Sequence, residues 1–369
     1  MHIAIDARII NSSTGRYIER LLHYLQSLDT TNNYTVLVRA KDKNYWKPTA
    51  SNFTVTVADF ADYSFSEQIG FKQLLDKLSP DLVHFCMPQQ PILYTGKAVT
   101  TIHDLTLLTT YNSDKNWFIF HAKQLVGNYV FKKVAHKSQH ILTPTHYVKK
   151  SLVEFANISP KKVTTTLEAA EEVHGEPEPY QLVDGKQFIM YVGSQSDYKN
   201  IKRLILAHQK LLPHHPDLQL VLVGKTSGKN GAAAGRNKAW CETNKHQNVI
   251  FTGFLPDSQL AWLYQNTSAY VFPSLMEGFG LPGLEAMISG APVVSSKATC
   301  LPEVYGDAAE YFDPTDVDDI AITIERVIDD NSLRDELIQK GYRQAAKYSW
   351  RRMAEQTYQV YMNILNQKS

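Results

Sequence analysis

The sequence predicts an α/β protein made of two doubly wound domains, each built around a parallel sheet. Its 369 residues suit two domains of middling size better than one large domain. Short apolar runs alternate with segments of helical periodicity along nearly the whole chain. These runs are apolar throughout, which is typical of strands buried on both faces of a parallel sheet.

The first half of the chain contains a series of expected strands separated by helical stretches. The strands are expected at residues 3–6, 34–38, 53–57, 82–86, 98–102, 141–144 and 163–167. Apolar residues recur at helical spacing from Ile18 to Leu28 and again from Phe71 to Leu78.

The second half repeats the alternation. Strands are expected at residues 188–192, 218–223, 249–251, 269–272, 292–295 and 309–312. Helices are expected at residues 200–212, 258–265, 283–289, 318–329 and 332–347.

The boundary between the domains is expected at residues 171–185, a polar, Pro-rich stretch without periodicity that suits a linker. The first domain then comprises residues 1–170 and the second residues 186–347. In open α/β sheets, ligands bind at the carboxyl ends of the strands. We therefore expect the functional residues on loops that follow strands, in a cleft between two facing domains.

Composition and charge narrow the class of function. Lys plus Arg number 38 and Asp plus Glu 37, and this near balance disfavours a protein that coats nucleic acid. Cys86, Cys241 and Cys300 lie far apart and form no CxxC pair, so we predict buried free thiols in a reducing compartment. The chain opens on an expected strand and contains no apolar run of bilayer length, so we expect a cytoplasmic protein with at most peripheral membrane contact.

Residues 273–287 have the highest density of candidate binding groups. This segment follows an expected strand and opens an expected helix, with Pro282 in the first helical turn. Glu277 lies on the loop and Glu285 in the first helical turn, so their carboxylates could bind different ends of one polar ligand that has vicinal hydroxyls. A Gly-Pro turn with a glutamate at a helix start is the alternative. In the binding interpretation, the start of the helix would add further donors to the ligand, namely the backbone N–H groups of Gly278, Phe279, Gly280 and Leu281.

The segment from Glu277 to Glu285 resembles the E-x7-E signature of retaining glycosyltransferases of the GT-B architecture, and most closely that of family four. The resemblance covers nearly the whole chain, because further landmarks follow in order. They are residues 6–8, 14–17, 81–84, 101–105, 191–193, 199–200, 252–257 and 348–350.

The resemblance implies two Rossmann-like domains facing across a cleft, with a helix in residues 348–369 that crosses back to the first domain. It implies a metal-independent, retaining hexosyltransferase of cell-surface glycan biosynthesis that needs no cofactor. Mannose is the first expectation for the sugar, then glucose or another hexose, carried by GDP or UDP. The acceptor would be a glycan or a lipid-linked saccharide, without nucleic acid, at the inner face of the cytoplasmic membrane.

Roles for donor-binding residues follow from the same resemblance. Lys199 would neutralise the departing diphosphate, and Glu277 would bind hydroxyls of the sugar. Glu285 would bind the ribose, and Phe254 and Leu255 would line the base. Tyr198 precedes Lys199 where an arginine is commoner in the family, so we expect one phosphate-binding charge to be absent or supplied by Arg203 or Lys225.

For the first domain, the resemblance implies that His103 hydrogen-bonds a sugar hydroxyl, as a third catalytic residue beside Lys199 and Glu277. Pairing of His103 with its neighbour Asp104 is the structural alternative. Gly15 and Arg16 would form an acceptor or phosphate loop. Gly15 is the one glycine where relatives usually have two or three, so the approach of a ligand to this backbone is less assured.

Three further features are open to a structural explanation or a different function. Asp316-Val317-Asp318 has the form of a DxD metal motif, but its setting favours a helix N-cap. Residues 231–236 are expected to form a flexible loop. The basic pairs at 132–133, 149–150 and 161–162 suit either a solvated surface or attraction to anionic lipid or a polyanionic acceptor.

A non-catalytic nucleotide-sugar or glycan-binding protein of the same architecture is the alternative function. A dehydrogenase is disfavoured, because this chain lacks the G-x-G-x-x-G motif after the first strand of either half.

Overall fold

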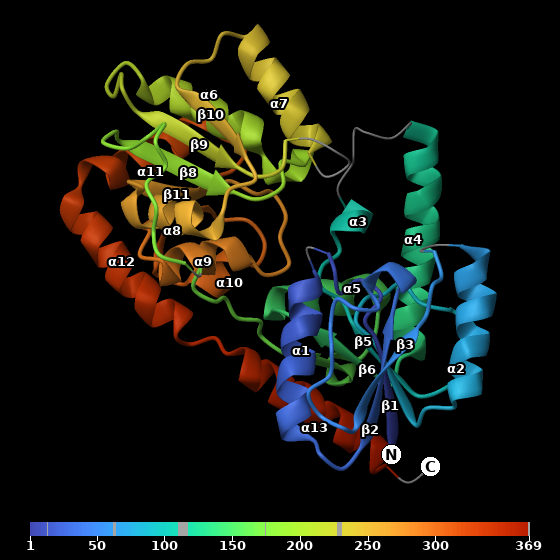
Figure 1. Ribbon diagram of the computed structural model, residues 1–369. Helices are drawn as coiled ribbons and strands as arrows, with labels where there is room; N and C mark the ends of the chain where they lie inside the picture. Colours follow the sequence, from blue (N-terminus) through green and yellow to red (C-terminus); the bar gives the residue numbers. More distant parts are fainter. Residues whose placement is uncertain (13, 62–63, 110–116, 174, 227–230, 368–369) are drawn as a thin grey trace. The chain divides into compact units, whose positions relative to one another are not determined.

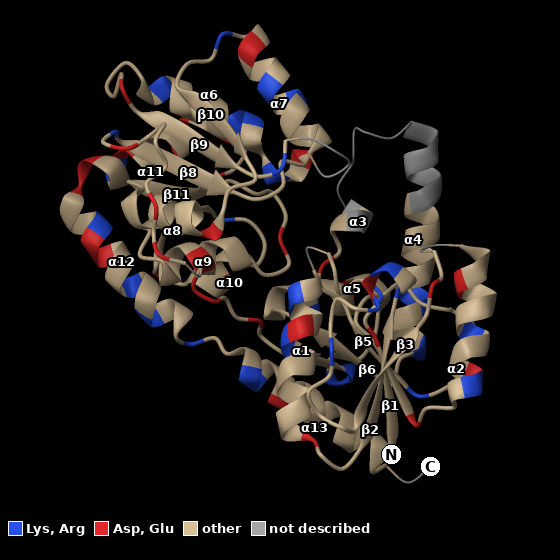
Figure 2. Ribbon diagram, in the orientation of Figure 1, with Lys and Arg blue, Asp and Glu red and all other residues tan. Residues whose placement is uncertain are grey.

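The chain folds into two compact units, shown in the computed structural model of Figure 1. Unit 1 comprises Met1–Thr109, Trp117–Glu168 and Ser349–Ser369, and unit 2 comprises Ala169–Tyr348. The structure describes residues 1–12, 14–61, 64–109, 117–173, 175–226 and 231–367. Acidic and basic residues are interspersed along the helices of both units, in keeping with the near-zero net charge (Figure 2).

Unit 1 is built on a seven-stranded parallel sheet with the order β3-β2-β1-β4-β5-β6-β7. Each strand predicted in the first half is present, with ends within two residues of those expected. The strands are β1 (His2–Asp6), β2 (Asn33–Val38), β3 (Phe53–Val57), β4 (Leu82–Phe85), β5 (Ala98–Thr101), β6 (His140–Thr143) and β7 (Val163–Thr165).

Helices connect the strands of unit 1, and the last helix of the chain completes it. They are α1 (Gly15–Leu28), η1 (Ala40–Asp42), η2 (Glu67–Phe71), α2 (Lys72–Leu78), α3 (Thr106–Thr109), α4 (Trp117–Lys137), α5 (His146–Ala156), η3 (Pro160–Lys162) and α13 (Trp350–Leu365). The predicted stripe of α1 is buried at Ile18, Leu21, Leu22 and Leu25. α13 lies against α1 (Figure 1), so the C-terminal segment belongs to the core of unit 1.

A buried chain of polar side chains ties α13 to the sheet. His84 on β4 contacts the Tyr361 hydroxyl of α13 through Nδ1 at 2.5 Å and Thr101 Oγ1 through Nε2 at 2.8 Å. Tyr17 of α1 reaches the same Thr101 hydroxyl at 2.9 Å. Burial, and secondarily the charge of His103, lowers the pKa of His84 to about 3, so His84 is neutral and can donate to one hydroxyl and accept from the other.

Unit 2 repeats the design with a six-stranded parallel sheet of order β10-β9-β8-β11-β12-β13. The strands are β8 (Phe188–Val192), β9 (Gln219–Val223), β10 (Val249–Gly253), β11 (Ala269–Phe272), β12 (Val293–Ser296) and β13 (Ala309–Phe312). The helices are η4 (Asp197–Lys199), α6 (Ile201–Leu211), α7 (Ala232–Thr243), α8 (Asp257–Asn266), α9 (Leu281–Ile288), α10 (Leu301–Tyr305), α11 (Val317–Asp329) and α12 (Asn331–Ala345). Every predicted strand and helix of the second half is present.

The flexible loop predicted at residues 231–236 is wrong, because most of these residues form the start of α7. Gly231 is the N-cap, and the helix begins at Ala232. Alanine has the highest helix propensity, and Ala234, Asn237 and Cys241 give the helix a buried side that packs near α6. The small residues that suggested flexibility therefore favour a helix once one side can pack.

Strand order places a topological switch at the same position in each sheet. β1 lies between β2 and β4 in unit 1, and β8 lies between β9 and β11 in unit 2. Loops after β1 and β4, and after β8 and β11, therefore diverge at the carboxyl edge, where doubly wound proteins bind ligands.

The three cysteines are buried and unpaired, as predicted. Among the described residues, no helix has both the length and the apolar character needed to cross a bilayer.

Replacing Tyr361 with phenylalanine tests the link between α13 and β4. The change removes the hydroxyl opposite His84 Nδ1 and leaves a buried polar atom without that partner, so we expect the free energy of unfolding to fall by about 1–3 kcal/mol. Urea denaturation followed by circular dichroism measures it. Tyr342→Phe, at a largely exposed position on α12, is the matched control and should change stability little. Equal effects of the two substitutions would contradict the role of the His84–Tyr361 contact.

Candidate functional site

Lys199 and Glu277 meet at the carboxyl edge of the unit 2 sheet, on the two loops that diverge from the switch point. Lys199 ends η4, which follows β8, and Glu277 lies on the loop after β11. The Lys199 Nζ atom is 2.5 Å from Glu277 Oε1, and both side chains are nearly buried, with 13% and 12% exposure. Sequence analysis predicted both residues as ligand contacts but not their pairing, because they are far apart along the chain.

The surroundings of Lys199 keep its ammonium charged. Burial by itself lowers the pKa of Lys199, but the Glu277 carboxylate more than compensates and raises it above its ordinary value. The ammonium also lies 5.1 Å from the Tyr198 ring centroid and 5.4 Å from that of Phe272, within range of cation–π attraction. Tyr198 stands where an arginine is commoner in the family. Its aromatic ring attracts the Lys199 ammonium, whereas an arginine at this position would repel it.

Asn200 holds the loops around this pair together. Its backbone is left-handed, with φ of 63°, and its amide donates to the carbonyls of Pro273 at 3.1 Å and Pro314 at 2.7 Å. Arg203 donates to the Asn200 side-chain oxygen at 2.9 Å, whereas Lys225 is exposed. Arg203, suggested above as a substitute phosphate ligand, therefore supports the asparagine that joins the loops after β11 and β13.

The glycine-rich turn is shaped by a tyrosine that sequence analysis missed. Gly280 is the N-cap of α9 with φ of 102°, and Tyr305 of α10 donates its hydroxyl to the Gly280 carbonyl at 2.6 Å. A Cβ atom on Gly280 or Gly283 would lie 2.6 Å or 2.2 Å from that hydroxyl oxygen. Both glycines are therefore needed for the turn to pack on Tyr305, and no local pattern connects them to α10.

The remaining donor-site residues differ in exposure. Glu285 lies in the second turn of α9 rather than the first, because the helix begins at Leu281, earlier than predicted, with Pro282 as its next residue. Phe254 follows β10 and is 76% exposed. Leu255 is buried, so Phe254 alone of the two offers an apolar face to a base.

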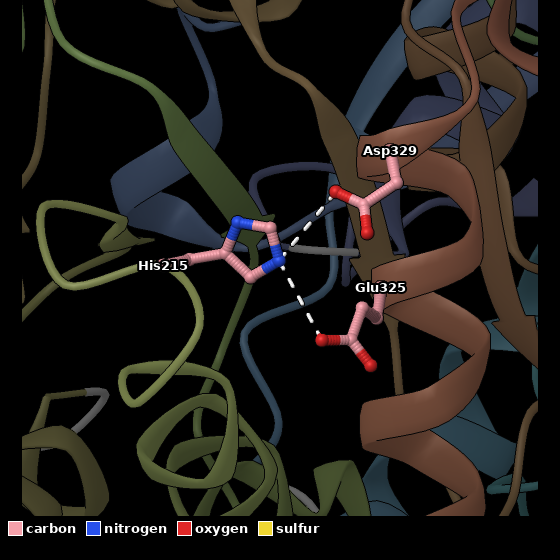
Figure 3. A group of neighbouring side chains, drawn as sticks. All are labelled: His215, Glu325 and Asp329. Atoms are coloured by element: carbon pink, nitrogen blue, oxygen red, sulfur yellow. Dashed lines mark ion pairs between the residues drawn. The ribbon is translucent and has the colours of Figure 1, made fainter.

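A group that could hold a metal ion lies at the opposite edge of the unit 2 sheet. Among the described residues, His215, Glu325 and Asp329 place one ligand atom each within 4.8 Å of one another (Figure 3). His215 Nε2 is 3.6 Å from Glu325 Oε1 and 3.5 Å from Asp329 Oδ1. His215 precedes β9 and so lies at the amino edge, away from Lys199 and Glu277.

The Asp316-Val317-Asp318 segment is a helix cap, as predicted. Asp316 is the N-cap of α11, and its side chain accepts from the backbone N–H groups of Asp318 at 2.9 Å and Asp319 at 3.3 Å. Asp316 thus satisfies two N–H groups of the first turn that have no partner within the helix.

In unit 1, Gly15 does not present its N–H group to a ligand as expected. That group donates to the Ser12 carbonyl at 3.0 Å. A Cβ atom at Gly15 would lie 1.7 Å from the Ile10 carbonyl oxygen, so the glycine is required for the tight entry into α1. Arg16 is exposed in the first turn of α1. The loop therefore offers the Arg16 side chain rather than the Gly15 backbone.

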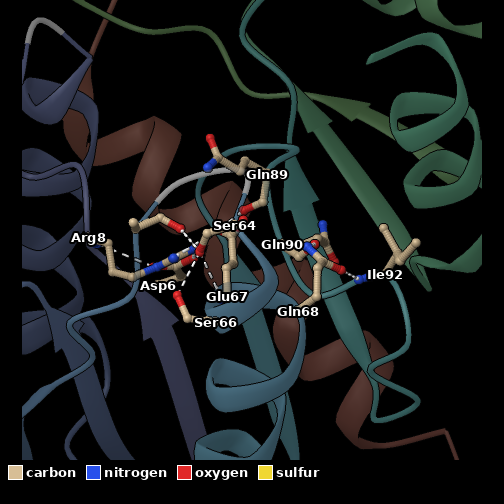
Figure 4. A network of polar contacts seen from close by, with 10 residues as sticks. Asp6, Arg8, Ser64, Ser66, Glu67, Gln68, Gln89, Gln90 and Ile92 are labelled. Carbon is tan, nitrogen blue, oxygen red and sulfur yellow. Dashed lines mark hydrogen bonds and ion pairs between the residues drawn. The ribbon is translucent and has the colours of Figure 1, made fainter. Parts of the chain in front are cut away.

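A buried network of charges fixes the carboxyl end of β1 beside this loop (Figure 4). Arg8 binds both carboxylate oxygens of Asp6, at 2.8 and 2.9 Å, and donates to Glu67 at 2.9 Å. Its guanidinium lies 4.2 Å from the Phe71 ring centroid, and all three charged side chains are almost fully buried. Arg8 and Asp6 therefore position the loop between β1 and α1, and solvent has little access to them.

His103, at the end of β5, is held by partners other than the neighbour considered above. Its Nδ1 lies 3.2 Å from Glu168 Oε1 and its Nε2 lies 3.0 Å from the Cys86 carbonyl oxygen. Asp104 instead accepts from the backbone N–H of Thr106 at 2.8 Å. Glu168 was not identified from the sequence, although its position just after the strand expected at residues 163–167 could have indicated it. Both ring nitrogens of His103 thus contact protein oxygens.

Two doubly wound units, with a polar site at the carboxyl edge of the second, define the GT-B architecture of glycosyltransferases. Sucrose-phosphate synthase from Thermosynechococcus elongatus matches the fold over 100% of both chains, with a TM-score of 0.79 and 16% identity. HepE from Anabaena, solved in complex with UDP-glucose, matches 98% of this chain and 100% of its own, with a TM-score of 0.73 and 15% identity.

Sequence comparison gives the family. Residues 175–344 match the family of glycosyl transferases group 1. O-antigen chain mannosyltransferase B of Escherichia coli is 32% identical over 287 residues, which are 72% of this chain and 70% of that protein. The serotype-specific mannosyltransferase WbdA of Escherichia coli is 31% identical over 73% of this chain, but the match spans only 34% of WbdA. The chain therefore belongs to the group 1 glycosyltransferases.

Substitution of Asp316 separates the cap from a metal ligand. Asp316→Ala removes the acceptor for two backbone N–H groups, so we expect unfolding free energy to fall by about 1 kcal/mol, and Asp316→Asn to retain most of it. Denaturant titration in the presence and absence of EDTA measures both. The loss should be the same with the chelator. A destabilisation seen only without EDTA would argue for a bound cation.

Proposed function

We propose that the chain is a retaining hexosyltransferase that transfers mannose from a nucleotide-diphosphate donor to a glycan or lipid-linked acceptor without a divalent ion. The observation that carries this proposal is the Lys199–Glu277 pair, nearly buried at the switch point of unit 2 beside the glycine-rich start of α9. The family fold supplies the reaction class, and the mannosyltransferase relatives support the sugar.

The donor would lie on the carboxyl edge of unit 2. Lys199 carries a permanent ammonium that would stabilise the negative charge developing on the leaving diphosphate, and a charge already in place needs no reorganisation during the reaction. The turn of Gly278, Phe279, Gly280 and Leu281, at the positive end of α9, would support the phosphates. Glu277 would accept hydrogen bonds from hydroxyls of the hexose, and its contact with Lys199 fixes it for that role.

The two ends of the nucleoside would be bound by residues on separate elements. Glu285 on α9 would accept hydrogen bonds from the ribose hydroxyls. Phe254, exposed after β10, would cover one face of the base. GDP is the first expectation because the sequence relatives are mannosyltransferases, and UDP is the second.

The acceptor would bind unit 1 near Arg16 and His103. The bond between the anomeric carbon and the diphosphate would break with assistance from Lys199, and the acceptor oxygen would attack from the same face while its proton passes to the departing diphosphate. This would retain the anomeric configuration. An NMR spectrum of the product would then show the α-configuration of an α-linked donor. An inverted product would overturn this part of the proposal.

Replacement of Lys199 tests the donor site. We expect Lys199→Ala to lower kcat/KM for transfer by at least about 100-fold, because it removes the charge opposite the leaving group, and Lys199→Arg to lose less. Thermal shifts with GDP, UDP, ADP and dTDP report nucleotide binding, and the best ligand of the wild type should stabilise Lys199→Ala less.

Lys238→Ala is the matched control for this experiment, because it removes one positive charge from an exposed side chain of α7. It should leave transfer and nucleotide binding unchanged. If the wild type neither transfers nor hydrolyses any donor but binds one of the nucleotides, the chain is a binding protein rather than an enzyme. Equal nucleotide binding by the wild type and Lys199→Ala would contradict the assigned donor site.

We also propose peripheral contact with an anionic membrane through α4. Leu125, Val126 and Tyr129 are 71%, 59% and 59% exposed and follow helical spacing. Lys132 and Lys133 continue the same exposed side. Apolar side chains followed by basic ones suit a helix that inserts shallowly between acidic lipid headgroups, which is where a lipid-linked acceptor would be found.

Vesicle sedimentation tests this contact. Binding to phosphatidylglycerol vesicles should exceed binding to phosphatidylcholine vesicles and fall with salt. Lys132→Gln with Lys133→Gln should weaken it roughly 30-fold, since each basic residue near an acidic surface contributes about 1 kcal/mol. The double change Lys202→Gln and Lys238→Gln, with the same loss of charge in unit 2, should weaken it much less. Equal weakening by the two pairs would indicate general attraction instead of a site on α4.

A further inference from the structure

We propose that Glu168 is a positioning residue that holds His103 as an imidazolium, so that unit 1 presents a fixed positive charge at the carboxyl end of β5. The inference rests on the proposed transfer reaction for its catalytic consequence, but not for the charge itself. It changes the role expected for His103, from a neutral hydrogen-bonding partner of a sugar to a cation oriented by the protein.

The partners of the two ring nitrogens carry the argument. A backbone carbonyl can only accept a hydrogen bond, so the Nε2 atom facing Cys86 at 3.0 Å must carry a proton. An ionised carboxylate also only accepts, so the Nδ1 atom facing Glu168 at 3.2 Å must carry one too. A neutral imidazole has a single N–H group and would set a lone pair against one of these oxygens. With Glu168 ionised, only the imidazolium satisfies both contacts.

Burial makes the pairing strong. The side chains of His103 and Glu168 are 16% and 7% exposed, so water screens their attraction little and hydrates the carboxylate poorly. A buried carboxylate without a cation would be costly. Burial alone lowers the pKa of His103, but the hydrogen bond and charge of Glu168, the Cys86 carbonyl and the charge of Asp104 together raise it.

The neighbouring elements fix the ring and add no competing base. Tyr17 of α1 packs its ring edge-on at 4.9 Å between centroids. The Cys86 thiol, on the loop after β4, is uncharged because burial raises its pKa well above the ordinary value, and the same holds for the Tyr17 hydroxyl. Asp104, beside His103 in sequence, adds a second negative charge.

His84 on the adjacent strand provides the internal contrast. Its ring nitrogens face two hydroxyls, which can donate or accept, so a neutral ring satisfies both. His84 is more deeply buried and has no carboxylate partner, and it is neutral, with a pKa of about 3. Two histidines on neighbouring strands therefore carry different charges because their partners differ in chemistry.

The charge of His103 decides what it can do in the reaction. An imidazolium has no lone pair for a proton, so His103 is not the base that receives the proton of the acceptor hydroxyl. The charged ring can therefore act on the reaction through its charge and its fixed position, and not by accepting a proton. Glu168 acts on the reaction only through His103.

Glu168→Gln tests the proposal, because it retains the size of the side chain and removes its charge. Side-chain NMR of isotopically labelled histidine, assigned with His103→Asn, should show wild-type His103 mostly protonated at pH 6.5. In Glu168→Gln the pKa of His103 should fall by about one to three pH units. Glu168→Asp, which keeps the charge, should retain a raised pKa, and if Glu168→Gln does not fold, the protonation state of wild-type His103 remains the test.

The pH dependence of transfer gives the second readout. Activity of Glu168→Gln should approach that of the wild type at acidic pH and decline at a lower pH than the wild type does, since deprotonation now occurs earlier. A purely structural defect would lower activity equally at every pH. Glu154→Gln, which removes an exposed carboxylate of α5, is the matched control and should leave both readouts unchanged.

The free energy of unfolding should depend on pH in the direction that a raised pKa of His103 requires. A raised pKa in the folded state means that protonated His103 stabilises the fold fully below its unfolded pKa of about 6.5, and this stabilisation is lost as pH rises through the folded pKa. The stability difference between wild type and Glu168→Gln should therefore be largest at acidic pH. A wild-type His103 that is neutral at pH 6.5 would overturn the proposal even if transfer is never observed. A charged His103 with an unchanged pH profile in Glu168→Gln would overturn its role in the reaction.

Discussion

The nearly buried Lys199 ammonium and Glu277 carboxylate lie in contact where the loops after β8 and β11 diverge, and the rest of the unit 2 site is arranged around them. Neither charge would be stable alone at this depth, since burial disfavours each ionised form. Asn200 joins the loops that carry them, and Tyr305 sets the glycine turn at their side. The contact thus keeps the Lys199 ammonium charged and holds the Glu277 side chain in place at the carboxyl edge of the sheet.

Unit 1 uses the same principle with different residues. His103 and Glu168 form a nearly buried ion pair at the end of β5, while Arg8, Asp6 and Glu67 form another at the end of β1. Each pair lies at the carboxyl edge of a parallel sheet, where strand ends from distant parts of the chain converge. Paired charges at such an edge are held rigidly, and a rigid charge stabilises a transition state at lower cost than a mobile one.

Strands and most helices could be predicted because their signals are local. A buried parallel strand such as 188–192 must be apolar throughout, and α11 shows its stripe and its Asp316 cap within a few residues. α7 was missed as a whole, because its run of glycine and alanine has no apolar stripe and its helicity depends on packing near α6. That the Gly15 N–H group donates to the Ser12 carbonyl could not be predicted, because only the folded loop brings the two together.

The sequence by itself determined the fold class, the parallel sheets and the positions of Lys199, Glu277, Glu285 and His103 after strands or at a helix start, because each depends on residue types within one short segment. Tertiary structure alone decided which charges meet: Lys199 with Glu277, His103 with Glu168, and Arg8 with Glu67. These partners come from different loops, and no pattern along the chain records a distance in space. The protonation of a buried group depends on that distance, so the charge that each residue carries follows from the fold.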